Sequence, residues 1–160
     1  MAKRILFVCL GNICRSPTAE GVVRAMAEAA GLTLELDSCG TGGWHVGEAP
    51  SALAVATARA RGYDLSPLRA RQVTREDFTR FDRIYAMDRT NLRDLQALRP
   101  EGGPESGVAP ELLLRHAPQH GDAVPDPWYT GEYDRTLDMI EDAARGLIAD
   151  LKAEVQARRG

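Results

Sequence analysis

The chain has 160 residues, of which 44% are hydrophobic and 27% are charged, and its net charge is −3 at pH 7. This length and composition are typical of a soluble globular protein, and we expect residues 1–160 to form a single domain. The acidic balance argues against general nucleic-acid binding, and no stretch reaches the roughly 18 apolar residues of a membrane span. Three cysteines without a secretory signal predict reduced thiols in a cytoplasmic protein.

The first informative segment is an apolar run at residues 5–8, followed by the sequence C-L-G-N-I-C-R-S-P at residues 9–17. The run is typical of a buried strand, and apolar residues then recur at helical spacing over residues 17–30. Pro17 suits the first position of a helix, and Ser16 suits its N-cap. The segment between strand and helix is therefore predicted to be a loop whose free N–H groups and helix dipole favour an anion.

Side chains of this loop could supply the parts of a phosphate site. Gly11 permits a positive φ and Asn12 tolerates one, so the loop can turn its amides inward as a nest. Cys9 is a candidate nucleophile, because the helix N-terminus and a nearby arginine would stabilise its thiolate. Arg15 can hold two phosphoryl oxygens with its planar guanidinium, and Ser16 can donate a hydrogen bond to the thiolate. Taken singly, such residues are more often core or turn residues; their spacing favours a site.

The remainder of the chain alternates between strand and helix patterns. Asp88 can cap the helix that follows the third strand, a structural role that is enough to explain it. The Gly- and Pro-rich residues 100–110 are predicted to form a loop. The alternation argues for a three-layer α/β fold with a parallel sheet and a ligand at the carboxyl ends of its strands. The predicted strands are 33–37, 83–87 and 111–114, of which the last could equally be a helical turn, and the predicted helices are 50–62 and 133–157.

Two further segments hold candidate site residues. A glycine-rich stretch at residues 40–43 leads to Trp44, which fits a wall of the site as well as a cap on the core. Asp126 lies between two prolines on a stiff segment and is followed by Trp128 and Tyr129. Alone, this segment is typical of a turn with two core aromatic residues. Beside a thiolate it becomes the expected general acid with an aromatic entrance.

The sequence predicts no metal site and no cofactor. His116 and His120 are four residues apart, but Pro118 between them makes a regular helix unsuitable there. Carboxylate or thiol partners at the spacing of a metal site do not surround them, so we expect both histidines in loops. Cys39 is interpreted as a buried filler of the core.

The loop, with its C-x5-R-S spacing and internal G-N-x-C, resembles that of the low-molecular-weight protein tyrosine phosphatases. The likeness continues through residues 71–73, residues 81–95 and Asp126 with the aromatic residues after it. It implies a four-stranded parallel sheet flanked by helices on both faces, with the phosphatase loop after the first strand and no metal. By resemblance, Cys9 is the nucleophile, Arg15 clamps the phosphate and the transition state, and Asp126 is the general acid.

The resemblance also implies how the rest of the pocket is used. Asn12 and Ser16 would shape the loop and the surroundings of the thiolate, and the aromatic residues would flank the phenyl ring of the substrate. One position departs from the pattern, because Leu68 stands near the place where the family often has a histidine that holds the loop asparagine. The phosphate- and substrate-binding residues implied are Leu10, Gly11, Asn12, Ile13, Cys14, Ser16, Trp44, Trp128 and Tyr129.

The resemblance implies hydrolysis of protein phosphotyrosine and small aryl phosphates through a cysteinyl-phosphate intermediate, with inorganic phosphate as product. Its partners would be tyrosine-phosphorylated proteins, with no role for nucleic acid or membrane. An ionised Cys9 and a protonated Asp126 predict a bell-shaped pH profile. Peroxide could also join Cys14 to Cys9 in a reversible disulfide; a purely buried role for Cys14 is equally open.

Three alternatives are compatible with the same loop. A phosphoarginine phosphatase would, by resemblance, carry threonine after the loop asparagine; Ile13 would crowd the additional guanidinium nitrogen. A thiol-coupled arsenate reductase would relay oxidation to cysteines near the third strand, and residues 75–95 contain none. A binding module without catalysis is disfavoured by the intact Cys9, Arg15 and Asp126.

Overall fold

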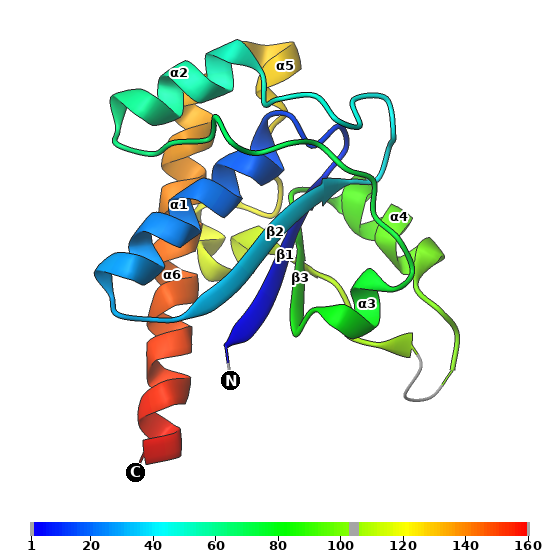
Figure 1. Ribbon diagram of the computed structural model, residues 1–160, viewed down its shortest axis with the longest axis vertical. Helices are drawn as coiled ribbons and strands as arrows, with labels where there is room; N and C mark the ends of the chain where they lie inside the picture. The colour runs from blue at the N-terminus through cyan, green and yellow to red at the C-terminus, as the bar shows by residue number, and fades with distance from the viewer. Residues whose placement is uncertain (1, 103–105, 160) are drawn as a thin grey trace.

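The computed structural model describes residues 2–102 and 106–159 and places a β-sheet between two layers of helices (Figure 1). The predicted loop at 100–110 includes residues 103–105, which lie outside the described residues. The elements in chain order are β1 (Lys3–Cys9), α1 (Arg15–Ala29), β2 (Leu34–Gly40), α2 (Ala52–Ala60), α3 (Asp77–Arg80), β3 (Arg83–Ala86), α4 (Arg89–Leu98), β4 (Glu111–Leu112), the 3₁₀ turns η2 (Leu113–His116) and η3 (Pro118–His120), α5 (Pro127–Thr130) and α6 (Tyr133–Arg159).

Within the described residues the sheet has four strands in the order β2-β1-β3-β4, and all neighbouring pairs are parallel. β1 lies at the centre of the sheet, and Phe7 pairs with Ser38 on one side and with Tyr85 on the other. The three-layer α/β prediction is confirmed. The leucine-rich segment is a strand and a helical turn in succession, because β4 ends at Leu112 and η2 begins at Leu113.

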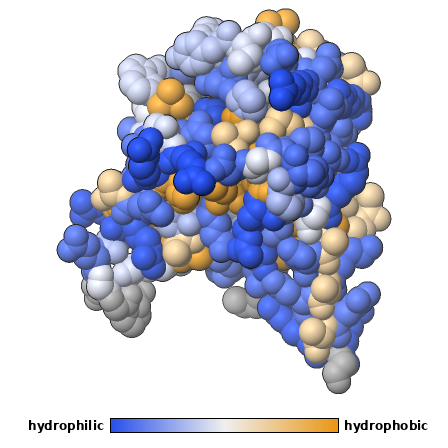
Figure 2. Space-filling model, turned by 180° about the vertical axis from the view of Figure 1, so that it is seen from behind, coloured by the Kyte–Doolittle hydropathy of each residue, from blue (hydrophilic) through white to orange (hydrophobic). Residues whose placement is uncertain are grey.

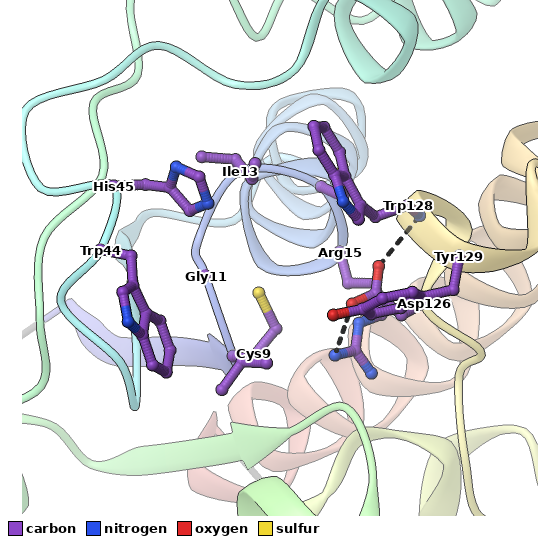
Figure 3. Close-up of a pocket in the computed structure, with 11 residues that line it drawn as sticks. Cys9, Gly11, Ile13, Arg15, Trp44, His45, Asp126, Trp128 and Tyr129 are labelled. Carbon is purple, nitrogen blue, oxygen red and sulfur yellow. Dashed lines mark hydrogen bonds and ion pairs between the residues drawn. The ribbon is translucent and has the colours of Figure 1, made fainter.

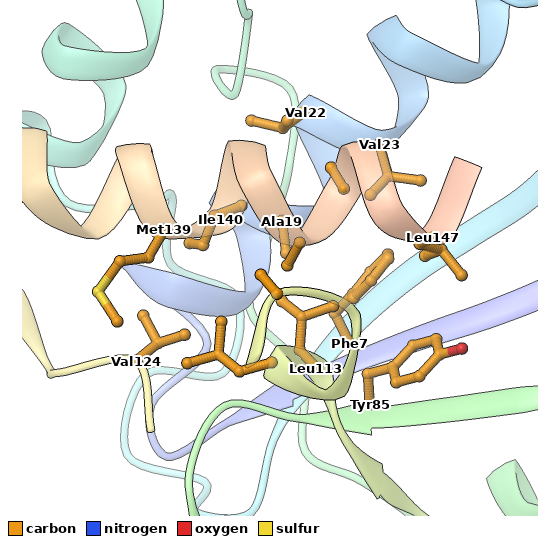
Figure 4. Close-up of a cluster of buried hydrophobic side chains, with 14 of the residues drawn as sticks. Phe7, Ala19, Val22, Val23, Tyr85, Leu113, Val124, Met139, Ile140 and Leu147 are labelled. Atoms are coloured by element: carbon orange, nitrogen blue, oxygen red, sulfur yellow. The ribbon is translucent and has the colours of Figure 1, made fainter. Parts of the chain in front are cut away.

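Alternation along β1 divides the core between the two faces of the sheet. Ile5 and Phe7 pack into the cluster covered by α1 and α6, and Figure 4 shows Phe7 below α6. Leu6 and Val8 face the opposite way and pack with Phe78 and other residues of the cluster around α3 and α4. Both faces of β1 are therefore buried, as expected for a central parallel strand, and its carboxyl end is held rigidly.

Two of the boundaries that differ from the predictions lie next to the loop between β1 and α1, at residues 10–14. β2 extends to Gly40, because its last residues pair with the end of β1 as far as Cys9. α1 begins at Arg15, and its N-cap, Cys14, makes no side-chain cap bond. Ser16 is therefore not the N-cap. Its hydroxyl lies 3.0 Å from the sulfur of Cys9 instead.

α2 and α5 lie at the end of the molecule towards which β1 and β2 run (Figure 1). α5 was not predicted; the Asp126 side chain caps it by accepting from the backbone N–H of Trp128. Among the described residues, no helix is both long and apolar enough to cross a membrane. Figure 2 shows mainly hydrophilic residues on the face seen from behind, with hydrophobic residues gathered in a band across its middle.

Candidate active site

The end of β1 and the start of α1 open into a pocket of about 240 Å³ (Figure 3). The loop at residues 10–14 thus begins and ends on regular elements, which hold its side chains in defined positions. Figure 3 shows Trp44 and His45 on one side of the pocket and Asp126, Trp128 and Tyr129 on the other. The lining residues are Cys9, Leu10, Gly11, Ile13, Cys14, Arg15, Trp44, His45, Asp126, Trp128 and Tyr129.

The backbone of the loop turns at Asn12, whose φ is 58°. The positive φ that either residue could adopt falls on Asn12 and not on Gly11. Its lack of a side chain matters for another reason, because a Cβ there would lie 3.1 Å from Cδ2 of His45. The left-handed turn directs the N–H of Asn12 to the Cys9 sulfur at 3.2 Å. The loop therefore points an amide at the thiol, as in the predicted nest.

Cys9 is almost fully buried and lies beside the N-terminus of α1. Its sulfur has two polar neighbours, the N–H of Asn12 and the hydroxyl of Ser16. A thiolate can only accept hydrogen bonds, so in that state the Ser16 hydroxyl must be the donor. A hydrogen-bond donor and the positive end of a helix dipole beside the sulfur are the surroundings that a nucleophilic cysteine requires.

Arg15 is held by acidic and carbonyl groups that aim its guanidinium at the pocket. Its Nη1 donates to Oδ2 of Asp88 at 2.7 Å and to the carbonyl of Val124 at 3.0 Å, and its Nη2 lies 3.6 Å from Oδ2 of Asp126. Burial alone would lower the pKa of Arg15, but Cys9, Asp88 and Asp126 together raise it. The guanidinium therefore stays charged although it is only 3% exposed.

Asp88 has a second role that its sequence context does not indicate. It caps α4 as predicted, because its Oδ1 accepts from the N–H of Asn91 at 2.8 Å. Its other oxygen binds Arg15, which is 73 residues away in the chain. The signal that could have revealed this is its place at the carboxyl end of β3, the strand next to β1.

Asp126 enters the pocket from the opposite side to Trp44. Its Oδ1 accepts from the N–H of Trp128 at 3.0 Å, and its Oδ2 faces Arg15 (Figure 3). The cap on α5 fixes the position of the carboxyl group, and its side chain remains partly exposed to solvent. A proton can therefore pass between this group and a molecule in the pocket.

Three aromatic side chains surround the entrance of the pocket. Trp44, Trp128 and Tyr129 are 73%, 59% and 78% exposed. Trp44 is thus a wall of the pocket and not a cap on the core, and the other two are not core residues either. His45 also lines the pocket and was not singled out from the sequence. Its Nδ1 lies 2.8 Å from Oε2 of Glu48, and its position directly after Trp44 was the available signal.

The glycine-rich stretch after β2 supports the loop by close contact. The backbone N–H of Thr41 donates to the carbonyl of Cys9, and that of Gly42 donates to the carbonyl of Leu10. A Cβ at Gly40 would lie 2.5 Å from the carbonyl oxygen of Leu10. One at Gly42 would lie 1.9 Å from the ring of Trp44. Gly40 needs glycine because the backbone of the loop occupies the space of a side chain, whereas a side chain at Gly42 would displace the exposed ring of Trp44.

The side chains of Asn12 and Ser16 do not line the pocket but are buried beneath it. The amide nitrogen of Asn12 donates to Oγ of Ser16 at 2.8 Å and to Oγ of Ser38 at 3.0 Å. Its amide oxygen accepts from the backbone N–H of Arg71 at 3.0 Å. Leu68 has no part in these hydrogen bonds, so Ser38 and the backbone at Arg71 support the asparagine.

The described residues include all three cysteines, and each is free. Burial is the main cause that raises the pKa of Cys14, whose Sγ donates to Oγ of Ser51 at 3.3 Å. Cys39 is fully buried, as expected for a core filler, and burial raises its pKa well above the ordinary value. A disulfide between Cys9 and Cys14 stays a prediction. Among the described residues, no group of three or more His, Cys, Asp or Glu side chains could hold a metal ion.

Comparison with known proteins gives consistent matches along the chain. The family model described as low molecular weight phosphotyrosine protein phosphatase matches residues 4–157. A low molecular weight protein-tyrosine-phosphatase of Streptomyces coelicolor is 43% identical over 166 residues, which cover 99% of each chain.

Solved structures agree with these matches. The crystal structure of YfkJ from Bacillus subtilis has a TM-score of 0.88 at 36% identity, over 96% of this chain and 97% of that one. The Drosophila arginine phosphatase DARP has a TM-score of 0.85 at 27% identity, over 92% of this chain and 97% of that one. Fold, family model and identity together show that the chain belongs to the low-molecular-weight phosphotyrosine protein phosphatases, which are hydrolases.

Proposed function

We propose that the chain hydrolyses phosphotyrosine in proteins, and small aryl phosphates, through a cysteinyl-phosphate intermediate on Cys9. The observation that supports this best is the convergence of Cys9, Arg15 and Asp126 on one pocket with an aromatic rim. A nucleophile, a cationic clamp and a carboxyl group are the three parts that this reaction requires. The chain acts as a single domain, and its three free cysteines suit the reducing cytoplasm.

In the first step, the Cys9 thiolate attacks phosphorus in line with the phenolic leaving group. The S–P bond forms as the P–O bond breaks, and its electron pair passes to the phenolic oxygen. Asp126 gives its proton to that oxygen, so phenol leaves in neutral form. Loop amides and Arg15 hold the three equatorial oxygens while their charge shifts.

In the second step, water attacks the phosphocysteine. Asp126, now a carboxylate, takes a proton from the water as the new P–O bond forms. The S–P bond breaks, and its electron pair returns to the sulfur of Cys9, to which Ser16 donates a hydrogen bond. Inorganic phosphate is released and the enzyme returns to its starting state.

The shape of the pocket favours an aryl phosphate. Trp44 on one side and Trp128 and Tyr129 on the other can pack against a phenyl ring. The likeness to the Drosophila arginine phosphatase makes phosphoarginine the second candidate substrate. Ile13 lines the pocket with an apolar, β-branched side chain that crowds the additional guanidinium nitrogen and offers it no hydrogen bond.

The test compares hydrolysis of phosphotyrosine, phosphoserine and phosphoarginine peptides, each with and without a chelator. We expect phosphotyrosine to be preferred, unchanged rates with chelator and a bell-shaped pH profile. Cys9→Ser should abolish turnover, and Asp126→Ala should reduce kcat on phenyl phosphate by roughly 10²–10⁴-fold.

An Asp126→Ala enzyme with the full rate and an unchanged pH profile would show that Asp126 is not the general acid. Preference for phosphoarginine would move the enzyme to the second substrate class. Arsenate reduction that depends on Cys9, without phosphatase activity, would overturn the reaction itself.

A further inference from the structure

A chain of hydrogen bonds runs from the nucleophile to a buried carboxylate that the proposed mechanism does not use. It passes from the loop to β2 and back to α1, and each link is 3.0 Å or shorter. Cys9 Sγ lies 3.0 Å from Ser16 Oγ, which lies 2.8 Å from Asn12 Nδ2. Asn12 Nδ2 lies 3.0 Å from Ser38 Oγ, which lies 2.8 Å from Glu20 Oε1.

Glu20 at the end of this chain is only 4% exposed. Its second oxygen, Oε2, binds Nη2 of Arg24 at 2.9 Å, on the same helix and one turn on. Burial raises the pKa of Glu20, as does Asp37 on β2, whereas Arg24 and Ser38 lower it. Burying a carboxylate is costly, so its retention beside the loop requires a reason other than packing.

The donors and acceptors along the chain leave little choice of direction. An ionised Glu20 can only accept, so the Ser38 hydroxyl gives its hydrogen to the carboxylate. The oxygen of Ser38 is then free to accept from the amide nitrogen of Asn12. The N–H of Arg71 binds the amide oxygen of Asn12, which fixes the amide with its nitrogen toward both serines.

The same logic determines what Ser16 can do. Asn12 Nδ2 has two hydrogens, and the two serine oxygens receive one each. Ser16 accepts one of them and keeps its own hydrogen for a further acceptor. The Cys9 sulfur lies at 3.0 Å and the carbonyl of Cys39 at 3.3 Å, so the thiolate is the nearer and the charged acceptor.

We propose that Glu20, with Arg24 as its counter-ion, is a positioning residue: it takes the Ser38 hydrogen and so holds the Ser38 oxygen as an acceptor for Asn12, which reinforces the amide orientation in which Ser16 donates to the Cys9 thiolate. The inference rests on the proposed role of Cys9 as nucleophile. A donor held toward the sulfur stabilises it both before attack and as the leaving group of the second step. Without the carboxylate, the Ser38 hydroxyl could turn its hydrogen elsewhere. The orientations of Asn12 and Ser16 would then be held less firmly.

The test replaces Glu20 with glutamine, which keeps the shape but can donate an N–H to Ser38. Two quantities are measured: the pH dependence of Cys9 alkylation by iodoacetamide, localised by mass spectrometry, and kcat and KM on an aryl phosphate. We expect the alkylation midpoint to move to higher pH and kcat to fall about tenfold, as for one lost hydrogen bond to a charged group. KM should change little, because the phosphate contacts remain.

Glu28→Gln, at an exposed position on the same helix, is the matched control and should change neither quantity. Ser38→Ala interrupts the chain, so adding Glu20→Gln to it should cause no further change, whereas Ser38→Thr keeps the hydroxyl and should resemble the parent. A Glu20→Gln enzyme with the parent midpoint and kcat, or additive effects in the double variant, would refute the proposal.

A second variant covers the case in which Glu20→Gln does not fold. Arg24→Gln removes the counter-ion at an exposed position, which raises the pKa of Glu20 further, so kcat should fall selectively at the acid end of the profile. An unchanged profile would overturn the proposal. Alkylation needs no turnover, so these results stay separate from the proposed function, which fails instead if the parent hydrolyses no phosphate ester.

Discussion

Single side chains in this enzyme serve two elements at once, and Asp88 is the clearest case. One of its oxygens accepts a hydrogen bond from a free N–H in the first turn of α4, and the other orients Arg15. The capping role follows from an aspartate before a helical pattern and could be predicted. The ion pair could not, because no local pattern relates residues that are 73 positions apart.

At the residue scale, Ile13 should decide between the two candidate substrates. Threonine keeps the β-branch but is shorter, and it carries a hydroxyl that can bind a guanidinium nitrogen. Ile13→Thr should therefore raise the ratio of phosphoarginine to phosphotyrosine kcat/KM by about tenfold or more, as expected when a polar partner is added to a pocket. Parallel assays of both peptides measure this ratio.

Val46→Thr is the matched control, because Val46 is exposed and does not line the pocket. It should leave the ratio as in the parent. An Ile13→Thr enzyme with an unaltered ratio would show that selection depends on the aromatic rim and not on the loop.

At the scale of elements, the end of β2 and the loop after β1 act as one unit. Gly40→Ala would place a methyl group 2.5 Å from the carbonyl oxygen of Leu10, so the loop must shift. We expect kcat/KM to fall by about a hundredfold, the usual effect of a displacement near 1 Å in a catalytic group. Steady-state kinetics on an aryl phosphate measure the loss.

Gly146→Ala is the matched control on α6, where a Cβ would lie 2.2 Å from the carbonyl oxygen of His116. It should lower the melting temperature but leave kcat/KM near the parent value. Equal kinetic losses in the two variants would mean that general destabilisation, and not the position of the loop, limits the rate.

The elements with strong periodicity were predictable, and those set by neighbours were not. The apolar runs identified β1 and most of α6 from the sequence. The last residues of β2 resembled a loop because of Gly40, yet pairing with β1 keeps them extended. α5 has four residues, too few for a helical pattern, and depends on the Asp126 cap. Likewise, no local pattern indicates the ion pairs of Arg71, whose guanidinium is bound by Asp37 and Asp77.

At the scale of the whole molecule, a polar cluster ties the sheet to α6 on the side away from the pocket. The ring nitrogens of His116 contact the hydroxyl of Tyr85 at 3.0 Å and Asp150 at 3.0 Å. Burial lowers the pKa of His116 below its ordinary value of 6.5, although Asp150 opposes this. The folded protein therefore keeps this histidine neutral at pH values where the unfolded chain would protonate it.

This sets the sign of a stability change. The unfolded state binds more protons between the lowered pKa and 6.5, so the contribution of His116 is complete above pH 6.5 and is lost as pH falls. His116→Gln, which can still donate to Tyr85, should reduce the loss of unfolding free energy between about pH 7 and about pH 5. Urea titrations across this range measure it.

His120→Gln is the control, since it removes a histidine from the neighbouring 3₁₀ turn without emptying a fully buried position. Between about pH 7 and about pH 5, it should lose as much unfolding free energy as the parent protein does. If His116→Gln loses as much stability as the parent does, then the acid sensitivity of the fold arises from other groups.

The two tryptophans of the chain, Trp44 and Trp128, both stand at the entrance of the pocket and are mostly exposed. The intrinsic tryptophan emission of this protein consequently reports on that entrance and not on the core. Phosphate or an aryl ligand that enters between the indoles should alter the emission directly, which gives a label-free titration of occupancy. Global unfolding should shift the emission maximum little, because both indoles already contact water in the folded state.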